Sequence, residues 1–272
     1  MPSFEALLPH LPAWLLVLFR IGGIFIFAPM FGSSAIPARI KIMLALALSM
    51  CIYPMLLGPD RPAAALIEPV IDTGLSMWVL GPAIFMELAI GFVIGYGATL
   101  PLMGLQLAGR MIDQQIGMGL AGVFNPELEG ESGIVGEIYF MLALAIFILM
   151  GGHRVAVMIL VGTFDNIPPG GFAFDGHLLA MVVALLGAMF ELAMRVAAPL
   201  LCIIFLQTVA MGFIARTVPQ LNILSIGFPV RILVGVLLLT ASVAVEAEVF
   251  IETMRWMMGG MRSFFESYSA GD

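Results

Sequence analysis

The chain has 272 residues, of which 61% are apolar and only 11% are charged. Soluble domains carry about 25% charged residues, so this composition excludes a soluble protein and predicts an all-α integral membrane protein. The 18 acidic residues outnumber the 11 basic ones, which argues against a nucleic-acid partner because such a partner requires a basic patch. The length allows roughly five to seven membrane-length helices, and no separate soluble domain is expected.

The first apolar run, residues 11–31, predicts a membrane helix that ends near Pro29 and is retained, because no basic leader precedes it. Arg20 lies in the middle of this run. A cation at the bilayer centre costs at least about 2.5 kcal/mol on insertion scales. We therefore expect Arg20 to contact other protein groups or a polar cavity instead of lipid.

Charges in the next two connectors predict the orientation of the chain. The connector with Arg39 and Lys41 holds the densest positive cluster and is expected in the cytoplasm, with the N-terminus outside. The apolar run 42–57 then returns across the membrane, and the acidic connector 58–74 is expected on the outer side.

The following apolar blocks have lengths that do not fit a simple series of membrane crossings. Residues 75–107 would span about 50 Å as a helix and residues 155–164 only about 15 Å, whereas the hydrocarbon core is about 30 Å thick. A second overlong block follows at residues 178–214. We therefore expect bent long helices and helical hairpins that bury themselves against other protein.

The first overlong block combines expected breaks with a face of small residues. Gly95, Gly97 and Pro101 predict the breaks. Gly91 and Gly95 form a GxxxG motif on the side that also carries Glu87, which allows another backbone to approach closely. Glu87 is then either hydrogen-bonded across this contact or part of a polar path, and the first alternative is favoured.

The central stretch, residues 109–133, is rich in glycine and yet apolar, with the sequence GRMIDQQIGMGLAGVFNPELEGESG. Its six glycines cost roughly 1 kcal/mol each inside a helix, so a regular helix is not expected. Irregular apolar backbone is tolerated in a membrane protein only where protein or a water-filled cavity surrounds it. We predict a loop folded into the interior across a passage; an extramembrane loop with glycine caps is the alternative.

The region after this stretch contains two sets of turn signals. Residues 134–164 predict a helical hairpin that turns at the GGHR sequence of residues 151–154. The PPGG sequence of residues 168–171 cannot be helix and predicts a tight turn.

The second overlong block carries an expected ion pair. Glu191 and Arg195 are four residues apart with the acid first, which is the favourable order on a helix. Pro199 cannot donate to the carbonyl of Arg195 and is expected to kink the helix there. Together these residues predict a buried polar seam in the bundle.

The C-terminal third is expected to hold one basic connector, a short apolar run and a tail. The connector 215–231 contains two arginines and no acid, so it should face the cytoplasm. The apolar run 232–245 is followed by three acids: Glu246, Glu248 and Glu252. These acids must leave the hydrocarbon early or be shielded by neighbouring helices. Residues 259–272 resemble a short polar tail.

The sequence contains none of the common catalytic motifs, because HExxH, GxSxG and the P-loop are all absent. The three histidines are far apart in the sequence. Cys51 and Cys202 lie inside apolar runs, where a thiol behaves as a small hydrophobic group. We therefore expect no enzymatic activity, no disulfide, no metal site and no cofactor.

Five segments resemble, in the same order, the FliR/SctT family of type III secretion export-gate proteins. They are RIGGIFIFAPMFGSSAIPARIK, QQIGMGLAGVFNP, MGGHR, AAPLL and RTVPQLNILSIGFPVRI. The resemblance extends from about residue 14 to residue 258. Its PQLN and GFPVR sequences are closer to the flagellar branch than to the injectisome branch.

The resemblance implies a subunit of the flagellar type III export gate, a multi-pass protein of the bacterial inner membrane within the flagellar basal body. It implies that residues 1–175 are FliP-like and that residues 176–272 form a FliQ-like helical hairpin. With FliP-like and FliQ-like subunits, the chain would form a channel for unfolded flagellar proteins on their way out of the cell.

Two sets of site residues are carried over from the family. The loop 110–133 would plug the closed pore through Arg110, Met111, Gln114, Gln115, Gly117, Met118, Gly119 and Phe124. The tip of the FliQ-like hairpin would face the cytoplasm and an FlhB-like switch protein through Pro219, Gln220, Asn222, Gly227, Phe228 and Pro229.

Two alternative functions remain open at this point. In a proton-coupled secondary transporter, Glu87 and the pair of Glu191 and Arg195 would carry the coupling, but the inverted repeat typical of many such proteins is not found. A structural membrane scaffold would need none of these residues to act.

Overall fold

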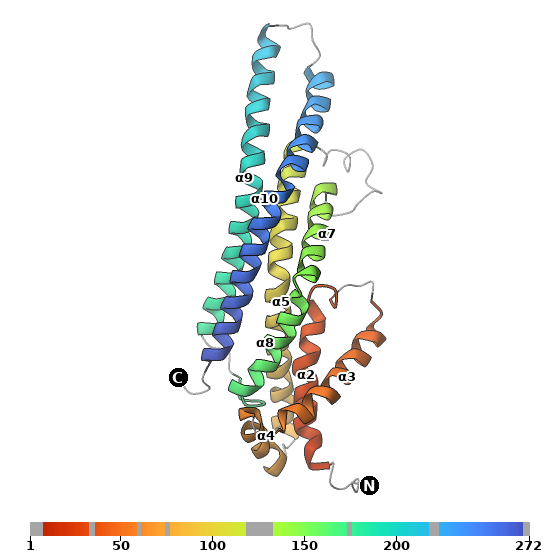
Figure 1. Cartoon of the computed structure of the whole chain (residues 1–272), viewed down its shortest axis with the longest axis vertical. Coiled ribbons are helices and arrows are strands. Elements are labelled where there is room, and N and C mark those ends of the chain that lie inside the picture. The colour runs from red at the N-terminus through yellow and green to blue at the C-terminus, as the bar shows by residue number, and fades with distance from the viewer. Residues whose placement is uncertain are drawn as a thin grey trace. The chain divides into compact units, whose positions relative to one another are not determined.

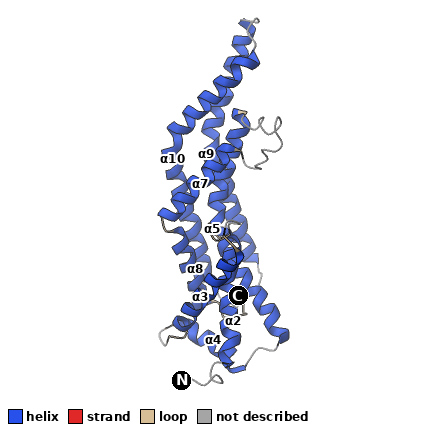
Figure 2. Cartoon of the chain, turned by 90° about the vertical axis from the view of Figure 1, so that its right-hand side faces the viewer, coloured by secondary structure: helices blue, strands red, loops and turns tan. Residues whose placement is uncertain are grey.

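The computed structural model describes residues 8–32, 36–58, 61–73, 77–117, 133–172, 176–217 and 223–268. Within these ranges the chain forms helices and connecting turns and contains no strand (Figures 1 and 2). Five described helices are long and apolar enough to cross a membrane, or six if the bent α7 and α8 pair counts as one span. The predicted class, an all-α multi-pass membrane protein, is confirmed. The elements in order are η1 (Leu8–His10), α2 (Leu11–Phe27), α3 (Ala38–Leu56), α4 (Pro62–Thr73), α5 (Met77–Ile116), α7 (Ile134–Leu149), α8 (Gly152–Asn166), α9 (Gly176–Thr217) and α10 (Ile223–Ser267).

Three helices are much longer than a membrane crossing requires. α5 has 40 residues, α9 has 42 and α10 has 45, so each is about 60 Å or more in length. The expected mismatch with a hydrocarbon core of about 30 Å is therefore confirmed. The expected breaks in α5 are wrong, because the helix continues through Gly95, Gly97 and Pro101. Each glycine costs only about 1 kcal/mol in a helix, and close packing against neighbouring groups offsets that cost.

Two predicted connectors are largely helical. Most of the acidic connector 58–74 is α4, which begins at Pro62, a residue well suited to the first helical position. The basic connector 215–231 is shorter than expected, because α9 continues to Thr217 and α10 begins at Ile223. Charge and turn residues indicated connectors here, but neither prevents a helix from forming.

The predicted polar tail is also wrong, because α10 continues to Ser267. Met257, Met261 and Phe265 are all buried. They are four residues apart, so they lie on one face of the helix and give it an apolar stripe that packs inward.

The pair α7 and α8 is not the expected hairpin, and its bend fits a broken span or a re-entrant loop. The chain bends by 63° at the break between the two helices, which is far from a reversal. Gly151 occupies the break with a φ of 70°, in the left-handed region that favours glycine. Only Met150 and Gly151 lie outside the helices, and the rest of the GGHR sequence belongs to α8.

Contacts divide the chain into two compact units. Unit 1 consists of Met1–Thr99, Met150–Leu185 and Trp256–Asp272, and unit 2 consists of Leu100–Leu149 and Leu186–Arg255. α5, α9 and α10 each contribute residues to both units. The division into FliP-like and FliQ-like parts is based on sequence resemblance, and the two compact units do not test it. That division stays a prediction.

In unit 1, α2 and α5 approach each other through glycines. A Cβ atom on Gly91 would lie 2.9 Å from Cα of Gly23 and 3.0 Å from the amide nitrogen of Ile24. A Cβ atom on Gly95 would lie 2.8 Å from the carbonyl oxygen of Ile24. The prediction that the GxxxG face receives another backbone is confirmed, and the partner is α2.

In unit 2, α5 packs against α7 and α9, again through glycines. A Cβ atom on Gly109 would lie 2.7 Å from Cα of Gly136 and 2.8 Å from the carbonyl oxygen of Val135. A Cβ atom on Gly104 would lie 2.9 Å from the carbonyl oxygen of Met189. The second half of α5 therefore has one neighbouring backbone at Gly104 and another at Gly109.

Candidate functional site

The first candidate site is a buried ion pair in unit 1 between Arg20 of α2 and Glu87 of α5. Both side chains are 0% exposed. Nε of Arg20 donates to Oε2 of Glu87, and Nη2 donates to Oε1 at 2.9 Å. This two-pronged pairing is among the stronger forms of charge-assisted hydrogen bonding.

The remaining donors of Arg20 also have partners, all near the end of α8. Nη1 donates to the hydroxyl of Thr163 at 3.1 Å, and Nη1 and Nη2 both lie 3.4 Å from the carbonyl oxygen of Ile167. The centre of the guanidinium group lies 4.1 Å from the centroid of the Phe164 ring, within range of a cation–π interaction. The prediction that Arg20 contacts protein groups is therefore confirmed.

Glu87 connects this pair to the predicted tight turn after α8. Its Oε1 accepts a hydrogen bond of 2.7 Å from the amide of Gly170. The turn is closed by the amide of Gly171, which donates to the carbonyl of Pro168 at 2.9 Å, and Gly170 has a φ of 78°. The turn prediction is confirmed. Because each oxygen of Glu87 has a donor, these contacts support the structural role that was favoured from its position beside the GxxxG motif.

The second predicted pair, Glu191 and Arg195, forms but is not buried within the chain. The two side chains are 2.7 Å apart on α9 and are 61% and 55% exposed. The spacing prediction is confirmed, whereas the expected burial is not found. Spacing on one helix determines that the two side chains can meet, but it does not determine which way that face points.

Replacing Glu191 by alanine should change the free energy of unfolding by no more than about 0.5 kcal/mol, because exposed pairs at this spacing contribute about 0.3–0.5 kcal/mol. Thermal unfolding of the detergent-purified chain would measure the change. A loss of several kcal/mol would mean that the pair is buried by something other than the chain itself.

The second candidate site lies in unit 2, where α5 enters the predicted plug stretch. Irregular backbone was expected from Gly109, but α5 stays helical to Ile116. This expectation is wrong because the close contact of Gly109 with α7 stabilises the helix. Four predicted plug residues are accordingly helical: Arg110, Met111, Gln114 and Gln115. Three others lie outside the described residues: Met118, Gly119 and Phe124.

Gly117 ends α5 with a backbone shape that suits glycine. Its φ is 89°, and its amide donates to the carbonyl of Asp113 at 3.0 Å. This is the usual form of a glycine that terminates a helix. A Cβ atom on Gly117 would lie 3.1 Å from the Phe228 ring of α10.

Asp113, which no sequence motif singled out, joins α5 and α7, the two helices on either side of residues 118–132. Its side chain is 2% exposed. One oxygen, Oδ2, accepts hydrogen bonds from the amides of Val135 at 3.0 Å and Gly136 at 3.2 Å, in the first turn of α7. No signal in the sequence indicates this role, since a cap provided from 22 residues earlier follows no local spacing rule.

The predicted hairpin tip is only partly described. Pro219, Gln220 and Asn222 lie outside the described residues. Three others were expected in a connector but belong to α10: Gly227, Phe228 and Pro229. Further along α10, the side chain of Ile116 packs against Gly235, where a Cβ atom would overlap it. α10 therefore also contacts the end of α5.

A buried acid lies between α7 and α10. Glu246 accepts hydrogen bonds of 2.6 Å from the hydroxyls of Tyr139 and Ser242. The expected shielding by neighbouring helices is confirmed for this acid. Glu248 and Glu252 are exposed within the chain.

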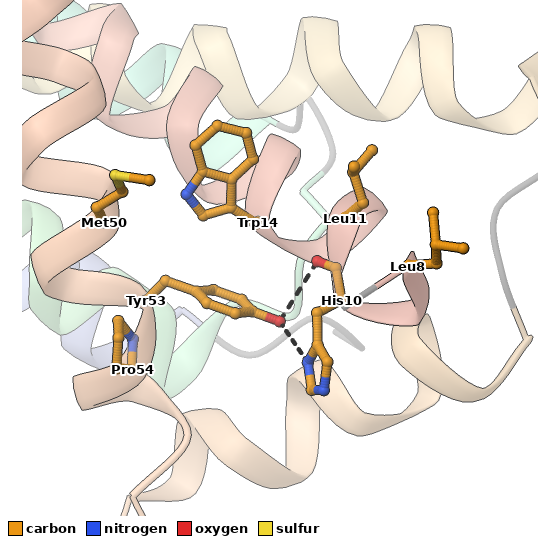
Figure 3. Close-up of a pocket in the computed structure, with 7 residues that line it drawn as sticks. All are labelled: Leu8, His10, Leu11, Trp14, Met50, Tyr53 and Pro54. Carbon is orange, nitrogen blue, oxygen red and sulfur yellow. Dashed lines mark hydrogen bonds between the residues drawn. The ribbon is translucent and has the colours of Figure 1, made fainter. Parts of the chain in front are cut away.

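Unit 1 also contains an apolar pocket of about 380 Å³ between the start of α2 and the end of α3 (Figure 3). His10 and Tyr53 face each other there, with Nδ1 of His10 2.9 Å from the Tyr53 hydroxyl. These groups partner each other, so the pocket suits an apolar group better than a charged ligand. The lining residues are Leu8, His10, Leu11, Trp14, Met50, Tyr53 and Pro54. Among the described residues, no three acids, histidines or cysteines lie close enough to hold a metal ion.

A family model described as "Bacterial export proteins, family 1" matches residues 11–257. The chain belongs to this family of bacterial export proteins. The match extends over nearly the whole sequence, including α2 to α9 and most of α10, and so includes both candidate sites.

Relatives within this export family agree with the assignment. The flagellar biosynthetic protein FliR of Bacillus subtilis (strain 168) is 30% identical over 257 residues, which cover 90% of this chain and 93% of that protein. FliR of Escherichia coli (strain K12) is 27% identical over 224 residues, 82% of this chain and 81% of that protein. The secretion system apparatus protein SsaT of Salmonella typhimurium is 27% identical over 157 residues, 57% of this chain and 61% of that protein. The resemblance to FliR is confirmed.

Proposed function

We propose that the chain is a subunit of the flagellar type III export gate in the bacterial inner membrane, at the base of the flagellum. The observation that carries this proposal is the family match over residues 11–257, together with a FliR relative that aligns over 93% of its own length. With FliP-like and FliQ-like subunits, the chain forms a channel for unfolded flagellar proteins. The FlhB-like switch protein lies near the connection between α9 and α10 on the cytoplasmic side.

The stretch between Gly117 and Gly133 closes the channel at rest. Its composition supports this role, because glycines give the backbone freedom and Met118 offers a flexible, polarisable side chain that can conform to different cargo. The geometry at its two borders also supports it. α5 and α7 contact each other directly through Gly109 and Gly136, so the stretch leaves and returns at one place in unit 2.

Co-purification tests the assembly. The chain, carrying an affinity tag, is purified from its own membranes in mild detergent, and the proteins that accompany it are identified by mass spectrometry. We expect small FliP-like and FliQ-like membrane proteins to elute with it. Elution as a lone homodimer would contradict the export-gate assignment and favour the transporter.

Replacing Gly117 by valine tests the plug. A side chain at a φ of 89° is strained by roughly 1–3 kcal/mol, and its Cβ would press on the Phe228 ring. We expect ion leak through the membrane to rise and secretion of flagellar proteins to fall. Both are measured in cells that carry the variant in place of the original chain.

Gly151→Val is the matched control for this variant. Gly151 has a φ of 70°, so it carries the same kind of strain, but no atom lies within 4 Å of its Cβ position. It lies beyond the opposite end of α7 from Gly133. Wild-type leak and secretion in Gly117→Val would show that the plug assignment is wrong, and equal leak in both variants would assign the effect to backbone strain alone.

The described contacts do not favour the proton-coupled transporter. Both oxygens of Glu87 are engaged by Arg20, and the Glu191 and Arg195 pair is more than half exposed. A structural scaffold without a gate differs from the proposed export gate in one measurable respect. In a scaffold, Gly117 variants would assemble and export normally.

A further inference from the structure

Asp113 lies on α5, just before residues 118–132, and its side chain accepts hydrogen bonds from α7, just after them. It belongs to the last turn of α5, one turn before Gly117, and its Oδ2 holds the amides of Val135 and Gly136 at the start of α7. Those amides have no partner within α7, because the first amides of any helix lack an acceptor inside it. A carboxylate from another helix therefore caps α7.

Glycines surround this carboxylate and let the two helices approach each other closely. A Cβ atom on Gly133 would overlap the Asp113 carboxyl group, so a larger residue before α7 would force this side chain to shift. A Cβ atom on Gly136 would lie 2.9 Å from Cγ of Arg110, and Gly109 packs on the backbone of the same turn. Three glycines thus bring the two helices close enough for one side chain to connect them.

We propose that Asp113 is a positioning residue that holds the end of α5 and the start of α7 together, and so fixes the separation of the two borders of residues 118–132. The hydrogen bonds to α7 perform this function, and Oδ1, which has no hydrogen-bond partner among the described residues, is not required for it. The consequence for leakage rests on the proposed plug function. The effect on the separation of α5 and α7 is independent of the plug function.

The variants Asp113→Ala and Asp113→Asn separate the hydrogen bonds from the charge. Alanine removes the acceptor and leaves the first amides of α7 unpaired. Asparagine keeps one oxygen in the same place, which can still accept from both amides. Glu137→Ala is the matched control, because it removes an exposed acid from the first turn of α7 without touching this contact.

The separation is measured by electron spin resonance between two spin labels in the full chain, co-purified with its partners. The labels are attached at Met103→Cys on α5 and Ile134→Cys on α7, which are both exposed positions in unit 2. Cys51 and Cys202 are exposed free thiols, so they are first replaced by serine. The amount of assembled complex is recorded for each variant, and only assembled complex is compared.

We expect the distance between the labels to lengthen and its distribution to broaden in Asp113→Ala, while Asp113→Asn and Glu137→Ala stay as in the parent. Ion leak should rise several-fold in Asp113→Ala only. An unchanged distance in Asp113→Ala would overturn the proposal, and so would an equal change in Asp113→Asn. A lengthened distance without leak would support the role of Asp113 and contradict the plug function.

If Asp113→Ala yields no assembled complex, hydrogen exchange decides instead. The amides of residues 135 and 136 are compared between the parent and Asp113→Asn. Equal slow exchange in both supports the proposal, and fast exchange in Asp113→Asn overturns it.

Discussion

Replacing Glu87 by alanine should destabilise the chain by about 3–5 kcal/mol, because Arg20 would remain buried without its counter-charge. Both side chains are fully buried, so water cannot replace the lost carboxylate. The amide of Gly170 would lose its acceptor as well, which loosens the turn after α8. Thermal unfolding of the detergent-purified chain, followed by circular dichroism, measures the loss.

The double variant Arg20→Met with Glu87→Met is the control. It removes both charges and keeps similar side-chain volumes, so we expect it to be more stable than Glu87→Ala. The glutamine variant Glu87→Gln retains one acceptor, so its stability should fall between that of Glu87→Ala and that of the double variant. If the double variant were less stable than the single one, the loss would come from packing and hydrogen bonding and not from an unpaired charge.

The sequence was sufficient to predict the Arg20 and Glu87 site in outline. A cation in the middle of an apolar run must find a polar partner, and an acid beside a GxxxG motif points toward a close helix contact. These are rules about single residues and about spacing on one helix. They could not show that the two residues meet each other, because 67 residues separate them.

The errors in the predicted elements have a common cause. Glycine, proline and charge favour irregular structure at Gly109, at residues 58–74 and at residues 259–272, yet most of these positions are helical. The local preference of a residue against helix is weak, amounting to about 1 kcal/mol for a glycine, and the stabilisation from tertiary contacts exceeds it. The contact between Gly109 and Gly136 and the buried stripe at Met261 are such contacts, and neither is visible before the fold is known.

Asp113 shows a further limit of sequence reasoning. Helix caps are recognised from residues directly before a helix, and here α7 begins after Gly133, which has no side chain to offer. The acceptor comes from Asp113 on α5, 22 residues before Val135. Only three-dimensional packing shows that this acid has a partner on another helix.

Replacing Gly23 by alanine should destabilise unit 1 by about 1–3 kcal/mol or more, because the added methyl group would clash with backbone atoms of α5. Its Cβ would lie 2.9 Å from Cα of Gly91 and 2.9 Å from the amide nitrogen of Phe92, and it would overlap the carbonyl oxygen of Leu88. All three atoms belong to the backbone of α5, which cannot rotate away as a side chain could. Relief therefore requires α2 and α5 to separate, and this would also stretch the pair of Arg20 and Glu87.

The adjacent residue provides the control. Gly22 is on the same helix and has no atom within 4 Å of its Cβ position, so Gly22→Ala should gain up to about 1 kcal/mol from the better helix propensity of alanine. Both variants carry the same chemical change one position apart, and thermal unfolding in detergent compares them directly. Equal stability would contradict the close approach of α2 and α5. A loss confined to Gly23→Ala would mean that the contact between these two helices, and not the composition of α2, determines where glycine is required.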